Sequence, residues 1–282
     1  MKGLIGLDID GTITHKKNSI SPTVVSYLET LYKKGWVIAL LTGRTYTFAK
    51  SILDSFTFPI FFSSQNGAYS LKRPENKLLY KNYLSKDLIS KIDQITHNTE
   101  IGVTIYSGFD NNDTFYFRTN DFFKKYTDYI SELSNRDNCK IVDTFDLDII
   151  NESSLIQCVG QYNFMIALSE KIKKNNLDSM FNHSFIRDPF TTDFFLLMLT
   201  SKQASKGLSL KRLHKDICKN QGTIIAAGND DNDVTLLNAA DTKIVVANAP
   251  PHLLEMADFI APPPEENGII SALDNVIWRL EK

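Results

Sequence analysis

The sequence predicts an α/β protein, with a doubly wound, Rossmann-like parallel sheet as its core and an inserted α+β domain. Toward both ends of the chain, short aliphatic runs alternate with segments of helical periodicity. Aliphatic runs of this kind are typical of parallel strands buried on both faces, and the order strand-helix-strand indicates a doubly wound sheet. The middle of the chain carries aromatic runs that alternate with polar residues, which is the pattern of an antiparallel sheet.

The first core segment, residues 1–80, is expected to contain three strands joined by two helices. The strands begin near Leu4, Trp36 and Pro59, and the helices span residues 23–34 and 45–56. Ser21 and Pro22 predict the start of the first helix, because serine caps helices and proline suits the first helical position. Gly35 predicts its end.

The inserted domain is expected at residues 81–199, and the second core segment at residues 200–282. In the insert, the pattern predicts strands at 101–106, 114–118, 156–167, 185–187 and 193–199, and helices at 84–96, 122–133 and 168–180. In the second core segment it predicts strands at 222–227, 243–247 and 259–261, and helices at 207–215, 234–239 and 268–280. Two core segments around an insert therefore make up the chain.

Composition excludes several classes of protein. The 282 residues are 43% hydrophobic and 23% charged, which indicates a packed core and not a disordered chain. A formal net charge of -2 gives no global electrostatic reason to expect nucleic acid or an anionic membrane as a partner. The three cysteines are widely separated, which is typical of buried thiols in a reducing compartment. With no export signal and no spanning apolar stretch, we expect a cytoplasmic protein.

The first strand ends in two carboxylates, Asp8 and Asp10, followed by Gly11. Side chains repeat every second residue along a strand, so both carboxylates are expected on the same side. Two close carboxylates repel each other unless a cation compensates them, and oxygen-rich sites suit Mg²⁺. An ordinary Asp-Gly turn is the alternative.

Other polar motifs follow strands or begin helices in the same sheet. They are Thr42-Gly43-Arg44, Asn66, Lys206 and the segment from Gly228 to Asp233. Ligands of doubly wound sheets bind beyond the carboxyl ends of the strands, so these motifs are expected near Asp8 and Asp10. Together they suit phosphoryl transfer, which needs a nucleophile, a cation, donors for the phosphate oxygens and an acid for the leaving group. Singly, each also fits a turn, a surface lysine or a helix cap.

Four short motifs follow one another along the chain: Asp8-Ile9-Asp10-Gly11-Thr12, Thr42-Gly43-Arg44, Ser205-Lys206-Gly207 and Gly228-x-x-x-Asn232-Asp233. In order and spacing they resemble those of the haloacid dehalogenase (HAD) superfamily. Three further segments, with the large insert, look like the Cof-type sugar phosphatases with a class IIB (type C2B) cap: Ser64-Gln65-Asn66-Gly67-Ala68, Val246-Ala247-Asn248-Ala249 and Glu266-Asn267-Gly268.

The resemblance implies a catalytic role for three residues. Asp8 is the implied nucleophile, which forms an aspartyl-phosphate. Asp10 is the implied acid that protonates the leaving alkoxide and later activates water. Lys206 is implied to pair with the phosphate and with Asp8.

The resemblance also implies binding residues. Phosphate or substrate contacts are implied for Thr42, Gly43, Asn66, Lys206 and Asn232, and Mg²⁺ contacts for Asp8, Asp10, Asn229 and Asp233. Asn229 departs from the family, which more often has an aspartate directly after this glycine. An amide oxygen binds Mg²⁺ without adding charge, so either metal affinity is lower or Asp230 or Asp233 takes a larger share.

The expected function is that of a Mg²⁺-dependent phosphomonoester hydrolase acting on a small phosphorylated metabolite, with a sugar phosphate as the leading substrate class. A phosphotransferase of the phosphomannomutase kind and a catalytically weak metabolite-binding protein are the alternatives. No motif specifies the metabolite or an oligomeric partner.

Overall fold

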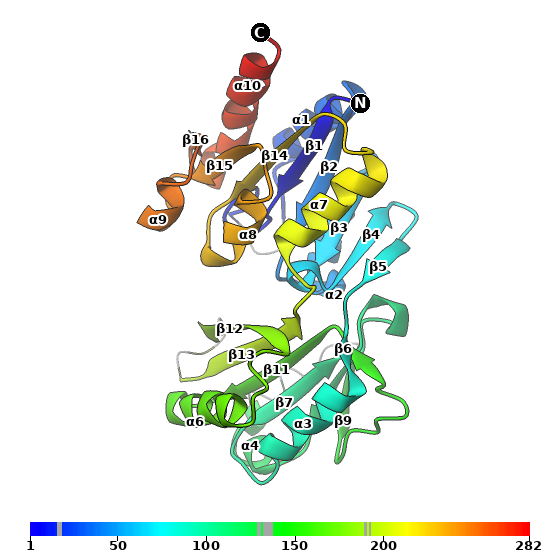
Figure 1. Cartoon of the computed structure of the whole chain (residues 1–282), viewed down its shortest axis with the longest axis vertical. Coiled ribbons are helices and arrows are strands. Elements are labelled where there is room, and N and C mark those ends of the chain that lie inside the picture. The colour runs from blue at the N-terminus through cyan, green and yellow to red at the C-terminus, as the bar shows by residue number, and fades with distance from the viewer. Residues whose placement is uncertain (16–18, 129–130, 132–137, 189–190, 192) are drawn as a thin grey trace. The chain divides into compact units, whose positions relative to one another are not determined.

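The chain divides into two compact units. A computed structural model describes residues 1–282 except residues 16–18, 129–130, 132–137, 189–190 and 192. The core unit comprises Met1–Tyr80 and Ser205–Lys282, and the inserted unit comprises Lys81–Ala204 (Figure 1). The insert was expected to end at residue 199. Its last strand continues to Ser201, because Thr200 and Ser201 still pair with the neighbouring strand.

The core unit is built on one eight-stranded sheet. Its strands are β1 (Gly3–Leu7), β2 (Trp36–Leu41), β3 (Ile60–Ser64), β4 (Tyr69–Arg73), β5 (Lys77–Lys81), β14 (Thr223–Gly228), β15 (Thr242–Val246) and β16 (Phe259–Ala261). They lie in the order β16-β15-β14-β1-β2-β3-β4-β5, and every pair from β16 to β3 is parallel. The predicted doubly wound fold is confirmed, while the antiparallel β4 and β5 were not predicted.

Helices pack against the strands of this sheet. They are α1 (Pro22–Lys33), α2 (Tyr46–Leu53), α7 (Lys206–Ile217), α8 (Val234–Leu237), α9 (Pro251–Leu254) and α10 (Gly268–Leu280). Helix α7 contacts α8 and β1, and α1 contacts α10 and β2. Pro22 occupies the first turn of α1 as expected, but Ser21 makes no side-chain capping bond. Three short 3₁₀ turns complete the unit: Gln65–Gly67, Asp231–Asp233 and Pro264–Glu266.

The inserted unit has its own sheet and core. Its strands are β6 (Leu84–Ser85), β7 (Gly102–Tyr106), β8 (Phe115–Arg118), β9 (Cys139–Val142), β10 (Glu152–Ser153), β11 (Leu155–Gly160), β12 (Phe181–Arg187) and β13 (Phe195–Ser201). Six of them form a mostly antiparallel sheet in the order β12-β13-β11-β7-β8-β9, and β10 pairs with β6. Its helices are α3 (Lys86–Thr96), α4 (Asp121–Lys125) and α6 (Tyr162–Lys174), with a 3₁₀ turn at Phe109–Asn111.

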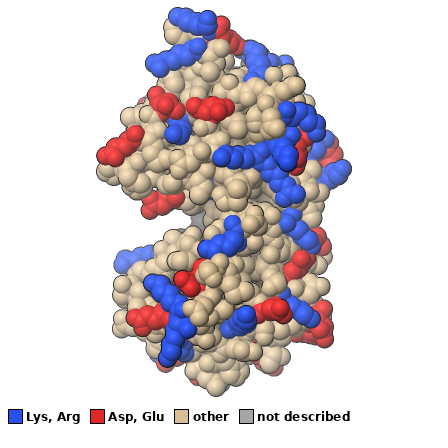
Figure 2. All heavy atoms as spheres, viewed as in Figure 1, with Lys and Arg blue, Asp and Glu red and all other residues tan. Residues whose placement is uncertain are grey.

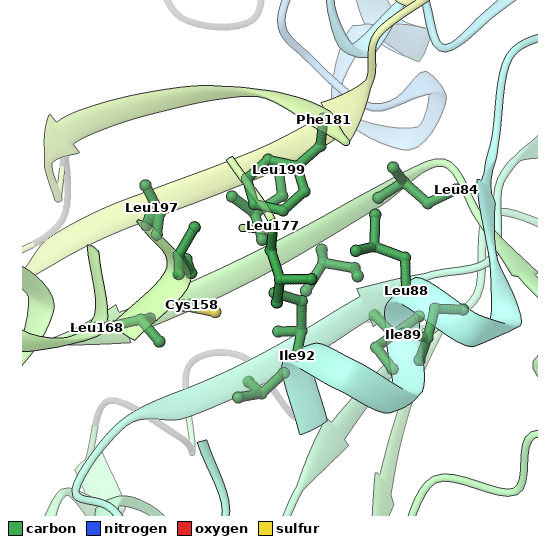
Figure 3. Close-up of a cluster of buried hydrophobic side chains, with 14 of the residues drawn as sticks. Leu84, Leu88, Ile89, Ile92, Cys158, Leu168, Leu177, Phe181, Leu197 and Leu199 are labelled. Atoms are coloured by element: carbon green, nitrogen blue, oxygen red, sulfur yellow. The ribbon is translucent and has the colours of Figure 1, made fainter. Parts of the chain in front are cut away.

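Apolar side chains of α3 and α6 pack against this sheet. Leu88 and Ile92 of α3 and Leu168 of α6 share one buried cluster with Cys158 and Leu199 of the strands (Figure 3). The unit is therefore a folded α+β domain with a core of its own.

Two expectations for the inserted unit differ from the structure. Residues 162–167 were predicted as the end of a strand, but they form the start of α6. The error arises because periodicity does not distinguish a short apolar strand from a buried helical turn. Of the helix expected at 122–133, α4 covers the beginning, and residues 129–130 and 132–133 lie outside the described residues.

The surface and the cysteines agree with the composition. Lysine, arginine, aspartate and glutamate side chains are interspersed on the face shown in Figure 2. Cys158 and Cys218 are buried free thiols, and Cys139 is partly exposed and also free. In the described part of the chain, no helix combines the length and apolar character needed to cross a membrane.

Candidate active site

Neighbouring parallel strands bring the predicted site residues together in the core unit. Asp8 directly follows β1, and its amide still donates to Ala227 of β14 over 3.0 Å. Thr42 follows β2 and Asn66 follows β3, while the segment from Asn229 to Asp233 follows β14. Since β14, β1, β2 and β3 are adjacent and parallel, these residues share one edge of the sheet.

The residues after Asp8 form a compact loop instead of a β-hairpin. The amides of Thr12, Ile13 and Thr14 all donate to the carbonyl oxygen of Ile9, at 3.1 to 3.3 Å. Gly11 has φ +76°, a backbone conformation that side chains rarely adopt. The loop therefore returns Thr12 toward Asp8, and its hydroxyl donates to Asp8 Oδ2 over 3.1 Å.

A buried lysine lies between two carboxylates. Lys206 Nζ donates to Asp8 Oδ1 over 2.7 Å and to Asp233 Oδ1 over 2.6 Å. The side chains of Lys206 and Asp233 are fully buried, and that of Asp8 is 6% exposed. Ser205 caps α7, accepting from the amide of Leu208, and thereby fixes the first turn from which Lys206 projects.

The charges in this group shift one another's pKa. The pKa of Asp8 is raised from 3.8 to about 7, chiefly by burial and further by repulsion from Asp233, while Lys206 acts in the opposite direction. Burial acts to lower the pKa of Lys206, but attraction by Asp8 and Asp233 outweighs it, so the pKa lies above its ordinary value. Lys206 is therefore charged, and Asp8 readily changes its protonation near neutral pH.

Asn229 lies near Oδ2 of Asp8, whereas Lys206 contacts Oδ1. Thr12 Oγ1 is 3.0 Å from Asn229 Oδ1 and 3.1 Å from Asp8 Oδ2. A side chain at Gly11 would place its Cβ 2.4 Å from Asn229 Nδ2, so glycine is required for this close approach. Two hard oxygen atoms, one carboxylate and one amide, therefore converge on the same hydroxyl.

Asp233 contacts both Lys206 and the loop that follows β14. Its Oδ1 accepts from Lys206, and its Oδ2 accepts from the amides of Asn229 and Asp230 at 2.9 and 3.2 Å. Because both oxygens are occupied and the side chain is fully buried, the geometry favours a role in holding Lys206 and the Asn229 loop.

Three polar residues and Gly43 lie together at the same edge of the sheet. Thr42 is buried, and its carbonyl oxygen accepts from the amide of Asn66 over 2.8 Å. Asn66 Oδ1 lies 3.5 Å from Asn232 Nδ2, and both amides are within ordinary contact distance of a Cβ built on Gly43. The structure thus places Thr42, Gly43, Asn66 and Asn232 together, with donors that suit an anion.

Arg44 is the residue for which no role was predicted from the sequence. Its Nε and Nη2 donate to the two carboxylate oxygens of Asp10, over 2.7 and 2.5 Å. The only signal in the sequence was its position directly after Thr42-Gly43. Thr12 was likewise part of a motif without an assigned contact.

The donor set fits Mg²⁺ better than a metal that needs a protein cage. Among the residues that the structure describes, no group of three or more His, Cys, Asp or Glu side chains could hold a metal ion. Mg²⁺ retains several waters and usually takes one or two carboxylates. Asp8, with the amide oxygen of Asn229 nearby, is compatible with that requirement.

The chain was compared with known proteins. A family model described as haloacid dehalogenase-like hydrolase matches residues 5–273. The chain belongs to this family. The predicted membership of the HAD superfamily and the prediction of a phosphatase are confirmed.

Relatives of this HAD chain match over nearly its whole length. The phosphatase YwpJ of Bacillus subtilis is 22% identical over 284 residues, covering 97% of this chain and 99% of the relative. A haloacid dehalogenase-like hydrolase from Bacteroides thetaiotaomicron has a similar structure, with a TM-score of 0.76 and 21% identity over 98% of this chain and 100% of that one. A sugar phosphatase of HAD subclass IIB has a TM-score of 0.68 at 15% identity, over 98% of this chain and 99% of that one. These structures support the same fold.

Proposed function

We propose that the protein is a Mg²⁺-dependent phosphomonoester hydrolase that acts on a small phosphorylated metabolite through a phosphorylated Asp8. The observation that carries this proposal is the buried Asp8, held by Lys206 on one oxygen and by Thr12 on the other. A carboxylate fixed in this way at the end of β1 is suited to in-line attack on phosphorus.

The proposed reaction has two steps, the formation and the hydrolysis of phosphorylated Asp8, and residues of this chain have a candidate role in each. In the first, an Asp8 oxygen bonds to phosphorus while Asp10 gives its proton to the departing alkoxide oxygen. In the second, Asp10 takes a proton from water, whose oxygen bonds to phosphorus and releases Asp8. The net reaction converts a phosphate ester and water into an alcohol and inorganic phosphate.

Other residues stabilise charge during these steps. Lys206 is charged and touches Asp8, so it can also neutralise a phosphate oxygen bonded there. Thr42, Gly43, Asn66 and Asn232 offer donors for the remaining oxygens. Asp8, the carbonyl oxygen of Asp10 and Asn229 would hold Mg²⁺, which supplies positive charge beside the phosphate when bound.

A sugar phosphate is the proposed substrate class. The support is the similarity in fold to the subclass IIB sugar phosphatase over 98% of this chain, a share that includes most of the inserted unit. The three free cysteines agree with the proposed cytoplasmic location.

A phosphatase screen tests the proposal. Purified protein with Mg²⁺ is expected to release inorganic phosphate from p-nitrophenyl phosphate and from some members of a panel of sugar phosphates. Asp8→Asn serves as the control, since it keeps the shape of the side chain and removes the nucleophile. Release no greater than that of the control across the panel would refute the proposed function, and isomer formation without free phosphate would indicate a mutase.

A further inference from the structure

Arg44 donates hydrogen bonds to both carboxylate oxygens of Asp10, the proposed acid. Its Nε donates to Asp10 Oδ2 over 2.7 Å and its Nη2 donates to Asp10 Oδ1 over 2.5 Å. This two-point contact fixes the plane of the carboxylate as well as its position, since the guanidinium fork is planar and rigid.

Arg44 is itself held from three other directions. Its Nη1 donates to the carbonyl oxygen of Phe48 over 3.1 Å. Its own carbonyl oxygen accepts from the amide of Gln65 over 3.0 Å and from Ser64 Oγ over 2.7 Å. The Arg44 side chain is 12% exposed, whereas that of Asp10 is 53% exposed. Arg44 is thus the fixed partner, and Asp10 is the one that would move without it.

The pair contributes little to folding stability. Water screens an ion pair whose carboxylate is half-exposed, so the attraction between the two charges adds little to stability. Its main consequence is therefore the orientation of Asp10. A proton transfer requires the acid within hydrogen-bonding reach of the leaving oxygen, so the orientation of a half-exposed side chain affects the rate directly.

We propose that Arg44 is a positioning residue, which orients Asp10 for proton transfer to the leaving group. This inference rests on the proposed phosphatase function. Arg44 itself neither gains nor loses a proton. It acts in the first step: Asp10, protonated on one oxygen and held by Arg44 through the other, passes that proton to the alcohol oxygen as the P–O bond to the alcohol breaks and the Asp8–phosphorus bond forms.

The leaving group provides a readout specific to this role. An alkoxide needs a proton as it leaves, whereas p-nitrophenolate is a stable anion and leaves without one. The value of kcat/KM reports the steps up to departure of the leaving group. The ratio of kcat/KM for a sugar phosphate to that for p-nitrophenyl phosphate therefore measures assistance by the acid. Both values come from one preparation, so the ratio does not depend on the folded fraction.

Arg44→Gln is the test variant and Arg73→Gln is its matched control. Arg73 is a buried arginine of the core unit, and its ion-pair partner is Asp54, at 2.8 Å, and not Asp10. Arg44→Gln is expected to lower the ratio about ten- to hundred-fold, a part of the gain usual for general acids. Arg73→Gln is expected to leave the ratio unchanged. In an Asp10→Asn background, Arg44→Gln is expected to change the ratio no further.

The results that would overturn the positioning role of Arg44 differ from the result that would overturn the proposed phosphatase function. An unchanged ratio in Arg44→Gln overturns the positioning role while the wild-type protein still hydrolyses its substrates. A further drop in the Asp10→Asn background overturns it too, because Arg44 would then act without Asp10. A wild-type protein that hydrolyses neither ester overturns the proposed function, and the inference with it.

Discussion

Replacing Asn229 by aspartate tests whether this residue belongs to the metal site. Thr12 Oγ1 lies 3.0 Å from Asn229 Oδ1 and 3.1 Å from Asp8 Oδ2, so the two oxygens are at most about 6 Å apart. At an effective dielectric constant of about 20, two unit charges at that distance repel by about 3 kcal/mol. That energy equals a rise of about two units in the pKa of Asp8.

The new charge is expected to have opposite effects without and with Mg²⁺. In the metal-free protein at about pH 8, Asn229→Asp is expected to lower the free energy of unfolding by about 1.4 kcal/mol, because the rise in the pKa of Asp8 lets this residue take up a proton and so avoid part of the repulsion. With Mg²⁺ the added carboxylate is attractive, and we expect roughly ten- to hundred-fold tighter binding, since ligand charge sets the affinity of hard cations.

Calorimetric titration with Mg²⁺ and thermal melts with and without the ion measure both effects. Asn238→Asp is a matched control, because it adds the same charge at an exposed position at the end of α8. If Asn229→Asp bound Mg²⁺ no more tightly than the wild type or the Asn238→Asp control, Asn229 would not be a ligand and the reasoning would be refuted.

Three further perturbations probe the same charges. Without Mg²⁺, the free energy of unfolding is expected to fall as pH rises from about 4 to about 7, because burial raises the pKa of Asp8 from 3.8 to about 7 and the folded protein keeps a proton that the unfolded chain releases. Denaturant titrations across this range measure the slope, and a slope that persists in Asp8→Asn would contradict this origin. Lys206→Met is expected to cost roughly 3–5 kcal/mol of stability by leaving Asp8 and Asp233 buried without their cation, and denaturant unfolding that shows a loss under about 1 kcal/mol would count against it. Gly11→Ala is expected to weaken Mg²⁺ binding in calorimetry, because its Cβ would lie 2.4 Å from Asn229 Nδ2 at φ +76°, and unchanged binding would show that Asn229 can move away at no cost.

A topological rule predicts that these candidate residues lie close together. Parallel strands that are adjacent in a sheet end at the same edge, so Asp8, Thr42, Asn66 and Asn229 could be expected together before any coordinate was known. The contact between Lys206 and Asp8 was implied by the family resemblance, and the structure shows it at 2.7 Å.

Other features depend on information that patterns do not hold. The strand predicted to continue to residue 167 ends at Gly160. The prediction was wrong because packing, and not periodicity, decides whether a short apolar run joins a strand or a helix. The hairpin of β4 and β5 has polar and apolar residues mixed at an edge of the sheet, so it lacks the aliphatic signal of the other strands. The hydrogen bonds from Arg44 to Asp10 depend on side-chain conformations, which the spacing of residues in the sequence does not specify.

The charges of the Asp10–Arg44 pair balance, but those of the Asp8–Lys206–Asp233 group do not. Asp10 is compensated by Arg44, so that pair is neutral. Lys206 is a single cation shared by Asp8 and Asp233, so one negative charge is uncompensated when both are ionised. Burial is the main reason why the pKa of Asp8 is raised, and repulsion from Asp233 adds to the rise; a phosphate ester bonded at Asp8 would enlarge the deficit of positive charge. The uncompensated negative charge therefore lies at Asp8, where Thr12 and Asn229 are close, and we expect a divalent cation there and not at the Asp10 carboxylate, which Arg44 already neutralises.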